Sequence, residues 1–144
     1  MSAARPPTGA NATIRPAPEP TIDSKPYWDG LKEHRLLLQQ CGNCGLVRHY
    51  PRPMCDACHS LEVRWIESSR QGRLYAWTEV HHPFVPGFRE EIPYVMATVE
   101  LEEGVRLQCQ MLGAEADALK LDLPVEIVFR EVQDGLVLPF AQVV

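Results

Sequence analysis

Hydrophobic and polar residues alternate along most of the chain from residue 72 onward, a pattern typical of strands that bury one face. The alternation predicts five strands, over residues 72–80, 94–101, 105–111, 125–129 and 136–143. In the first and third strands, the side chains expected to face the core are Leu74, Ala76, Thr78 and Val80, and Val105, Leu107, Cys109 and Met111. Cys109 is therefore expected to be a core residue rather than a nucleophile.

The segments between these strands predict how they connect. A stretch compatible with a short helix, residues 114–120, precedes the fourth strand, and the Asp134-Gly135 turn joins the fourth strand to the fifth. Three strands, a short helix and a final hairpin fit a small five-stranded Greek-key barrel, the OB-fold, over residues 72–144. An open antiparallel sheet is the alternative.

The N-terminal part of the chain follows a different pattern. Residues 1–24 are rich in proline and poor in large apolar side chains, so we expect an extended, poorly ordered strap. A short amphipathic helix is predicted over residues 25–35, capped by Asp23 or Ser24. Its aromatic pair, Tyr27 and Trp28, either covers an edge of the core or forms a docking surface for another chain.

Two Cys-x-x-Cys pairs give the strongest chemical signal in the sequence. Cys41, Cys44, Cys55 and Cys58 lie in turns between short predicted strands, within a ribbon expected over residues 36–71. Each turn can aim two thiolates at one point, so that the four sulfurs would complete a tetrahedral Zn(II) site. Four thiolates leave no position open for water, which predicts a structural rather than a catalytic zinc.

Other interpretations of the cysteines remain open. The two pairs could form a redox dithiol or an iron–sulfur site, although no thioredoxin-like pattern surrounds them. Gly45 follows the first pair, where a left-handed residue suits the turn, and His59 occupies the matching position after the second pair. His59 as a fifth or replacement ligand is the less favoured interpretation, because four sulfurs already close the site.

Composition and charge narrow the classes of function. The chain has 144 residues and a formal net charge of -5, enough for one ordinary domain or two very small ones. The longest apolar runs are far too short to span a bilayer, and no secretory signal is recognisable, so we expect a cytoplasmic location. Residues 90–144 carry three basic and eleven acidic side chains, a balance of -8. The negative charge of residues 90–144 disfavours binding of nucleic acid, whose phosphates are also negative. Residues 32–73, with seven basic and four acidic side chains, could contact a phosphate.

Catalytic motifs are not evident in the sequence. The best candidates for a general base are His81 and His82, but no positioned partner is recognisable for either. The loop that they begin contains Phe84, Val85 and Phe88, which are unusually apolar for a loop tip. These three residues therefore predict a contact surface for a partner.

Taken in order, the motifs resemble the acyl-CoA-associated zinc-ribbon/OB-fold family, formerly a domain of unknown function, over about residues 25–144. The motifs that carry the resemblance are Tyr27-Trp28, Cys41-x-x-Cys44, Pro51-Arg-Pro53, Cys55-x-x-Cys58, Gly72-Arg-Leu-Tyr75, Ile92-Pro-Tyr-Val-Met-Ala-Thr-Val-Glu-Leu101, Glu103-Gly-Val-Arg-Leu107 and Leu123-Pro-Val-Glu-Ile-Val-Phe129. Two departures affect turns: His59 and Asp122 stand where the family commonly has glycine. The resemblance implies a mainly β chain with a short N-terminal helix, a rubredoxin-like zinc ribbon and a five-stranded OB-fold barrel.

The resemblance also implies a function. Similar proteins are accessory subunits of thiolase-superfamily enzymes, including acyltransferases, thiolases and steroid side-chain retro-aldolases, or of hot-dog-fold enoyl-CoA hydratases. We therefore expect a non-catalytic subunit of a thiolase-like acyl-CoA complex that acts on carbon–carbon bonds. The basic side chains of the middle segment, Arg48, His49, Arg52, Arg70 and Arg73, could meet the phosphates of CoA.

Three further hypotheses remain. The chain could be the partner of a hot-dog-fold hydratase. It could be a single-stranded nucleic-acid-binding module, because OB-folds often have that role. It could also be an enzyme in its own right that acts on acyl groups through His81 or His82.

Overall fold

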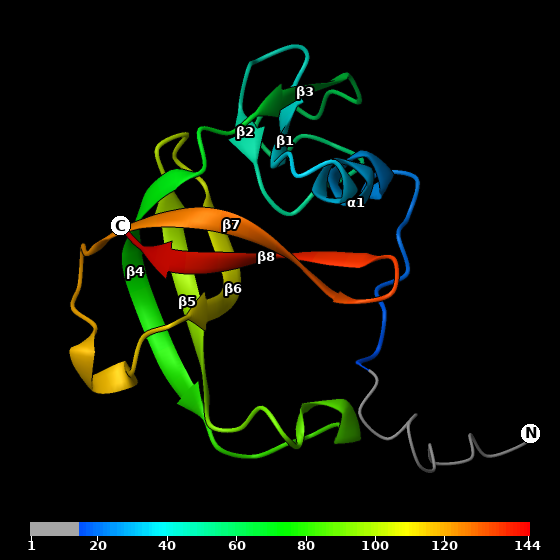
Figure 1. Cartoon of the computed structure of the whole chain (residues 1–144). Helices are drawn as coiled ribbons and strands as arrows, with labels where there is room; N and C mark the ends of the chain where they lie inside the picture. The colour runs from blue at the N-terminus through cyan, green and yellow to red at the C-terminus, as the bar shows by residue number, and fades with distance from the viewer. Residues whose placement is uncertain (1–14) are drawn as a thin grey trace, which may run out of the picture.

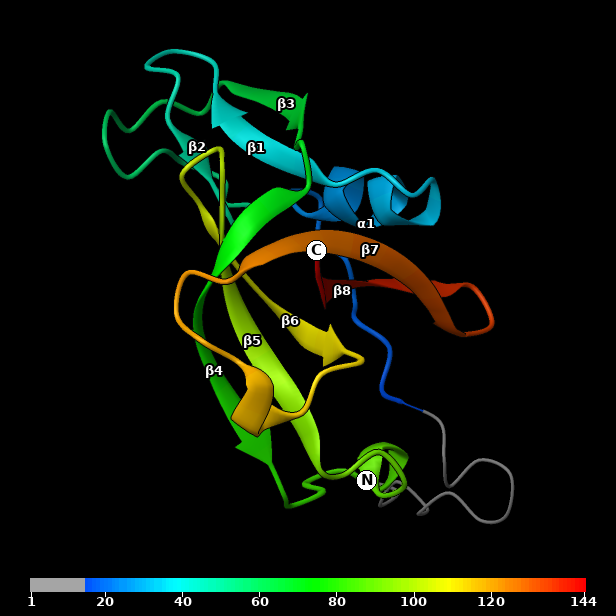
Figure 2. The same ribbon diagram turned by 60° about the vertical axis from the view of Figure 1, so that its left-hand side comes forward.

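The computed structural model describes residues 15–144 and places a small three-stranded ribbon on a closed five-stranded barrel, with one helix beside their junction (Figures 1 and 2). The expected fold class is confirmed: residues 15–144 are mostly β, with one short α-helix. The alternative of an open sheet is wrong, because the first and fourth barrel strands pair and close the barrel.

Helix α1 (Lys25–Lys32) has Pro26 in its first turn and ends earlier than predicted. The left-handed backbone of His34, at φ 58°, stops it, and the amide of Arg35 donates to the carbonyl of Gly30 at 2.8 Å. Ser24 occupies the N-cap position, but its Oγ accepts from the Thr21 amide at 2.9 Å rather than capping the helix. The buried face of α1 carries Leu31 at 0% exposure, so the helix is anchored to the core.

The ribbon is an antiparallel sheet in the order β2-β1-β3, formed by β1 (Leu37–Cys41), β2 (Val47–Arg48) and β3 (Val63–Glu67). Leu36 and Leu38 are fully buried and belong to the same apolar cluster as the barrel core. Residues 68–70, the linker between the ribbon and the barrel, are fixed as well. Ser68 Oγ donates to Glu103 Oε1 at 2.7 Å, and the Ser69 amide donates to Glu103 Oε2 at 2.8 Å. The ribbon and the barrel therefore form one packed body.

The barrel has the strand order β4-β5-β6-β8-β7, in which β6 and β8 run parallel and the other neighbours are antiparallel. Its strands are β4 (Gln71–Val80), β5 (Tyr94–Leu101), β6 (Arg106–Leu112), β7 (Pro124–Gln133) and β8 (Leu136–Val143). Two 3-10 turns interrupt the connections: η2 (Pro86–Phe88) lies between β4 and β5, and η3 (Ala116–Ala118) lies before β7, where a short helix was expected.

The alternation of buried and exposed residues is regular in β5 and β6 but not in β4. Cys109 is 5% exposed and lies in the core, as predicted. In β4 the pairing register shifts between Leu74 and Ala76, and such a bulge reverses which side chains face inward. Beyond it Trp77 packs against the core, whereas Ala76 and Thr78 are exposed, so the predicted inward positions of those two residues are wrong.

Candidate metal centre and surface elements

The four cysteines of the ribbon come together at its end. Their Sγ atoms all lie within 4.8 Å of one another. The Cys41–Cys58 and Cys44–Cys55 sulfurs are each 3.6 Å apart. A tetrahedral ion with metal–sulfur bonds of about 2.3 Å requires sulfurs about 3.8 Å apart. The donor set and its spacing therefore fit a four-thiolate metal site.

The same local turn builds both halves of this site. The amide of Gly45 donates to the Cys41 carbonyl at 3.1 Å, and the amide of His59 donates to the Cys55 carbonyl at 2.9 Å. Gly45 has φ 81° and His59 has φ 63°, so the histidine adopts the left-handed conformation predicted for it. The side chain of His59 is exposed and lies outside the cluster of ligand atoms, which does not favour its role as a ligand.

Backbone amides stabilise the thiolate of Cys41, one of the four sulfurs. The amides of Cys44 and Asn43 both donate to Cys41 Sγ at 3.4 Å. Mainly through the Cys44 amide, these contacts lower the pKa of Cys41 to about 6 and so favour the thiolate. Four thiolate ligands would fill a tetrahedral coordination shell. A metal ion in such a site can stabilise the fold but has no free position for a substrate.

Arg48, expected to meet a CoA phosphate, is instead a structural residue. Its side chain is 4% exposed, and its Nε donates to Gln39 Oε1 at 2.5 Å. The same oxygen of Gln39 accepts from the Arg52 amide at 2.8 Å. Arg48 therefore ties β2 to β1 and to the following turn, and the prediction of a phosphate contact through it is wrong.

The other three candidate arginines do not converge on one site. Arg52 is exposed on the ribbon near Asp56, with 3.7 Å between the charged atoms. Arg70, in the linker, lies over the ring of Phe129 at 5.7 Å. Arg73, on β4, pairs with Glu100 at 2.6 Å and lies 3.4 Å from Asp122. Each arginine thus has its own partner on a different element.

The aromatic pair of α1 is divided between the core and the surface. Tyr27 is 3% exposed, so the prediction that it contributes to a docking surface is wrong, and it covers the core edge instead. Its ring packs against Trp28, His49 and Tyr50 at centroid distances of 5.0, 5.1 and 5.7 Å. Trp28 is half-buried and donates from Nε1 to the Tyr50 hydroxyl at 2.7 Å.

The loop between β4 and β5, residues 81–93, is called the aromatic loop below, and it extends from the end of the barrel remote from the ribbon (Figures 1 and 2). Phe84 at its tip is 86% exposed. Val85 and Phe88 are half-buried, and the Phe88 ring packs against Tyr94 at 5.8 Å. Among the three predicted contact residues, Phe84 offers most of its surface.

The two candidate histidines lie at the base of this loop and are exposed. His81 Nε2 is 2.6 Å from Glu79 Oε1, and the ring of His82 contacts Phe84 edge-on at a centroid distance of 4.7 Å. Neither residue lines the cleft between the ribbon and the barrel that is described below. Their exposed surroundings do not favour a role as general base.

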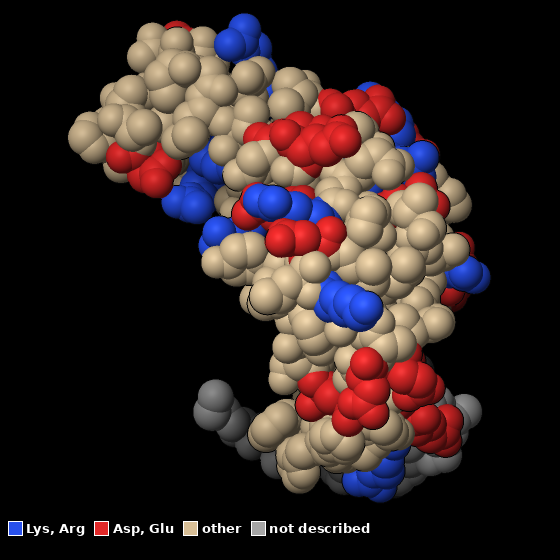
Figure 3. All heavy atoms as spheres, turned by 90° about the vertical axis from the view of Figure 1, so that its left-hand side faces the viewer, with Lys and Arg blue, Asp and Glu red and all other residues tan. Residues whose placement is uncertain are grey.

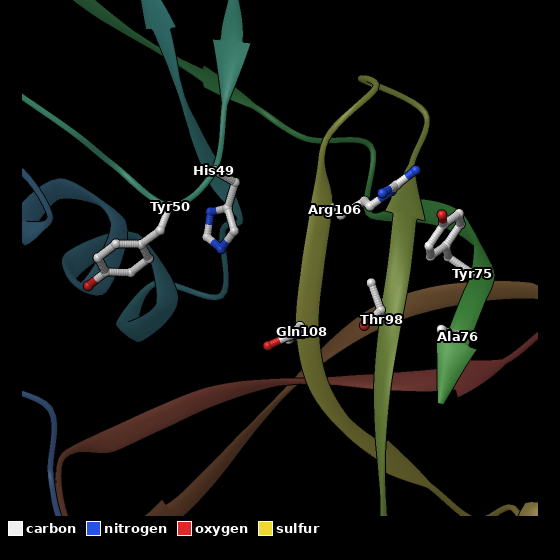
Figure 4. A pocket seen from close by; sticks show the side chains of 7 residues that line it. All are labelled: His49, Tyr50, Tyr75, Ala76, Thr98, Arg106 and Gln108. Carbon is white, nitrogen blue, oxygen red and sulfur yellow. The ribbon is translucent and has the colours of Figure 1, made fainter. Parts of the chain in front are cut away.

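A cleft between the ribbon and the barrel was not foreseen from the sequence. It has a volume of about 620 Å³, and Figure 4 shows its ribbon wall, formed by His49 and Tyr50, facing a barrel wall formed by side chains of β4, β5 and β6. On the barrel wall, the guanidinium of Arg106 stacks on the Tyr75 ring at 3.7 Å. Burial lowers the pKa of His49 to about 4, so its ring is neutral near pH 7.

Charge is mixed on the surface of the described residues. On the face in Figure 3, acidic and basic side chains are interspersed, with a group of acidic residues toward the end opposite the ribbon. A nucleic-acid groove would need a continuous basic surface, so this face does not favour that hypothesis. None of the helices in the described part of the chain has the length and apolar character needed to cross a membrane.

The fold and the cysteine cluster define a class of small proteins in which a four-cysteine metal ribbon is joined to an OB-fold barrel. Two family models match this chain: the "ChsH2, rubredoxin-like zinc ribbon domain" over residues 28–64 and the "ChsH2, C-terminal OB-fold domain" over residues 65–130. A DUF35 domain-containing scaffold protein of Pyrococcus furiosus is 35% identical over 118 residues, covering 78% of this chain and 85% of that protein. The chain belongs to this ChsH2/DUF35 family.

Relatives with enzyme names are also similar to the chain. A probable enoyl-CoA hydratase alpha subunit of Thermomonospora curvata is 36% identical over 126 residues, and a benzoylsuccinyl-CoA thiolase subunit BbsA of Geobacter metallireducens is 30% identical over 88 residues. The matches cover 88% and 61% of this chain, but only 39% of the hydratase subunit and 57% of the thiolase subunit. A solved structure titled "Ltp2-ChsH2(DUF35) aldolase" has a TM-score of 0.81 and 33% identity, covering 88% of this chain and 98% of the matched chain.

Proposed function

We propose that the chain is a non-catalytic subunit that assembles with a thiolase-superfamily enzyme and supports its action on an acyl-CoA, forming or cleaving a carbon–carbon bond. The observation that carries the proposal is the likeness to the chain from the Ltp2-ChsH2(DUF35) aldolase structure, 98% of which is matched. The similarity to a benzoylsuccinyl-CoA thiolase subunit supports the same class of partner.

The chemistry of the described residues agrees with a supporting role. Four thiolates around one point suit a closed structural zinc, which holds the ribbon together but activates no substrate. Zinc is the ion we propose, because four thiolates at these spacings are a common structural zinc set and the matching family model is described as a zinc ribbon. Bond making and breaking would then depend on residues of the larger partner.

Docking is proposed through the aromatic loop and the exposed part of Trp28. Phe84 can be buried by a partner at little cost, because its ring is already free of the core. A CoA contact through the four arginines is not carried forward, because Arg48 is buried and Arg73 is paired with acidic side chains. Hydratase activity is not assigned either, because the likeness to that relative covers 39% of its length.

The test is co-expression with a thiolase-superfamily subunit from the same organism, followed by size-exclusion chromatography with light scattering. We expect a stable hetero-oligomer, and we expect the partner's turnover of its acyl-CoA to fall strongly when this chain is omitted. The purified chain alone should not convert an acyl-CoA. Because His82 contacts Phe84 in the aromatic loop, the His82→Ala variant is assayed at a concentration that saturates assembly, where its complex should be as active as the wild-type complex.

Three outcomes would contradict the proposal. The first is failure of the two chains to associate. The second is full activity of the partner by itself. The third is acyl-CoA turnover by the isolated chain that His82→Ala abolishes, which would identify an enzyme. Association with a hot-dog-fold hydratase instead would correct the partner class.

A further inference from the structure

Arg15 lies at the start of the described residues and is joined to the barrel by its backbone. Its amide donates to Gln133 Oε1 at 3.0 Å, and Gln133 Nε2 donates to the Arg15 carbonyl at 3.0 Å. Gln133 is the last residue of β7, so this pair of hydrogen bonds fixes residue 15 to the β7–β8 hairpin. The segment predicted as a poorly ordered strap is thus attached to the barrel at this point.

The Arg15 side chain continues from the hairpin to the aromatic loop. Its Nη2 lies 2.5 and 2.6 Å from the two carboxylate oxygens of Glu91, and its guanidinium lies over the Phe88 ring at 4.9 Å. The same nitrogen is 3.4 Å from Gln110 Oε1 on β6. The side chain of Arg15 is only 10% exposed and that of Glu91 is 34% exposed, so water screens this ion pair less than an exposed pair.

Among the described residues, few hydrogen bonds or ion pairs other than those of Arg15 join the aromatic loop to the rest of the molecule. Its internal hydrogen bonds are short-range, from the amides of Phe84, Phe88, Arg89 and Glu91 to carbonyls two or three residues earlier. In the part of the chain that the structure describes, the ion pairs and hydrogen bonds that join residues 83–91 to another segment all involve Arg15. The ring of Phe88 also packs against that of Tyr94 at the end of the loop.

Phe84 lies at the tip of the loop that Arg15 holds and is 86% exposed, so a partner can bury its ring without disturbing the core. An apolar pocket is the surface that such a ring fits.

We infer that Arg15 is a positioning residue for the partner interface: it latches the aromatic loop in the conformation that presents Phe84 to an apolar pocket of the thiolase-superfamily subunit. The inference rests on the proposed function for the identity of the partner. The latch, meaning the contacts that join Arg15 to Gln133, Glu91 and Phe88, is a property of this chain alone. Arg15 acts through Phe84 and does not itself belong to the contact surface.

The latch is tested first without any partner, by hydrogen exchange of the isolated chain. Arg15→Ala should speed exchange of the amides of Phe88, Arg89 and Glu91 by about tenfold or more, while β5 amides stay as in the wild type. Lys25→Ala is the matched control, because it removes another N-terminal ion pair, to Asp29, that does not touch the loop. Unchanged loop exchange in Arg15→Ala would overturn the latch, whether or not a partner is found.

The second test measures the dissociation constant of the complex with the thiolase-superfamily subunit. Phe84→Ala and Arg15→Ala should each raise Kd about tenfold or more, whereas Leu121→Ala, at another exposed apolar residue, should leave it within about twofold. Because Arg15 acts through Phe84, the double variant should bind no more than about twofold more weakly than Phe84→Ala alone.

The results separate the two proposals. Additive losses in the double variant, or wild-type affinity in Arg15→Ala, would refute the positioning role although the complex exists. If the wild-type chain binds no such subunit, the proposed function fails, and the exchange experiment alone decides whether the latch exists. Faster loop exchange in Arg15→Ala, together with wild-type affinity in Phe84→Ala, would keep the latch but refute its role in docking, because the docking surface would then lie away from the loop.

Discussion

Replacing Cys44 by serine should remove the proposed zinc and unfold the ribbon. Cys44 is the suitable cysteine to change, because its side chain is exposed and a serine there buries no new hydroxyl. Its sulfur lies 3.6 Å from that of Cys55, so the substitution removes one corner of the four-thiolate set. Any loss of stability can then be attributed to the metal rather than to core packing.

The size of the effect follows from how little else holds the ribbon. Leu36 and Leu38 are its large aliphatic side chains with 0% exposure, and their burial contributes about 3–6 kcal/mol together. Structural zinc contributes about 10–16 kcal/mol in small zinc-folded peptides, or about 2.5–4 kcal/mol for each of four ligands if divided evenly. We therefore expect the Cys44→Ser chain to bind zinc about 10²–10³ times more weakly.

The assay combines the zinc content per chain, measured by elemental mass spectrometry, with hydrogen exchange of the backbone amides of β1 and β3. The expected result is substoichiometric zinc and rapid exchange of the ribbon amides. Cys109→Ala is the control, because Cys109 lies in the barrel core and should keep one zinc per chain. A Cys44→Ser chain with full metal content and wild-type protection of β1 would refute the structural role of the metal.

Two further predictions concern stability. Burial lowers the pKa of His49 from 6.5 to about 4, so below about pH 6.5 the unfolded chain binds a proton that the folded chain does not. The free energy of unfolding should therefore fall by about 3 kcal/mol between pH 7 and pH 4 through this residue, and urea titrations of His49→Gln should lack that part of the decline. Gly30→Ala should destabilise the chain by about 1–3 kcal/mol, although alanine favours helices, because the added Cβ would lie 2.9 Å from Leu37 Cγ and 3.0 Å from the Arg35 carbonyl oxygen. A rise in thermal stability of Gly30→Ala would contradict this packing argument.

The barrel and the ribbon could be predicted because their signals are local. Alternation marks strands wherever one face is buried, and a Cys-x-x-Cys turn carries its own geometry. The residues that replace glycine were also informative: His59 and Asp122 both have positive φ, at 63° and 62°. In these regions, the conformation of each residue depends mainly on its nearest neighbours in the sequence.

Burial of individual residues was harder to predict than the strands. Arg48 was interpreted as a surface cation because arginine is usually exposed, but a neighbouring strand supplies Gln39 as its buried acceptor. The bulge after Leu74 has no residue signature and reverses the two faces of β4. The cleft between His49 and Arg106 depends on how the ribbon packs on the barrel, which no local pattern encodes.

The contacts of Arg15 show most clearly what local sequence patterns cannot predict. Arg15 is separated by 76 residues from Glu91 and by 118 residues from Gln133, and it lies in a proline-rich segment whose composition predicts disorder. Such a segment can still be held at one residue when that residue satisfies several partners at once, as the Arg15 backbone and guanidinium do. The side chain of Arg15 contacts Phe88, Glu91 and Gln110, none of which belongs to the buried core, so its loss should leave the metal ribbon and the barrel core unaffected. Removing the latch should therefore loosen the aromatic loop while the unfolding midpoint of the chain stays close to that of the wild type, a combination that general destabilisation would not produce.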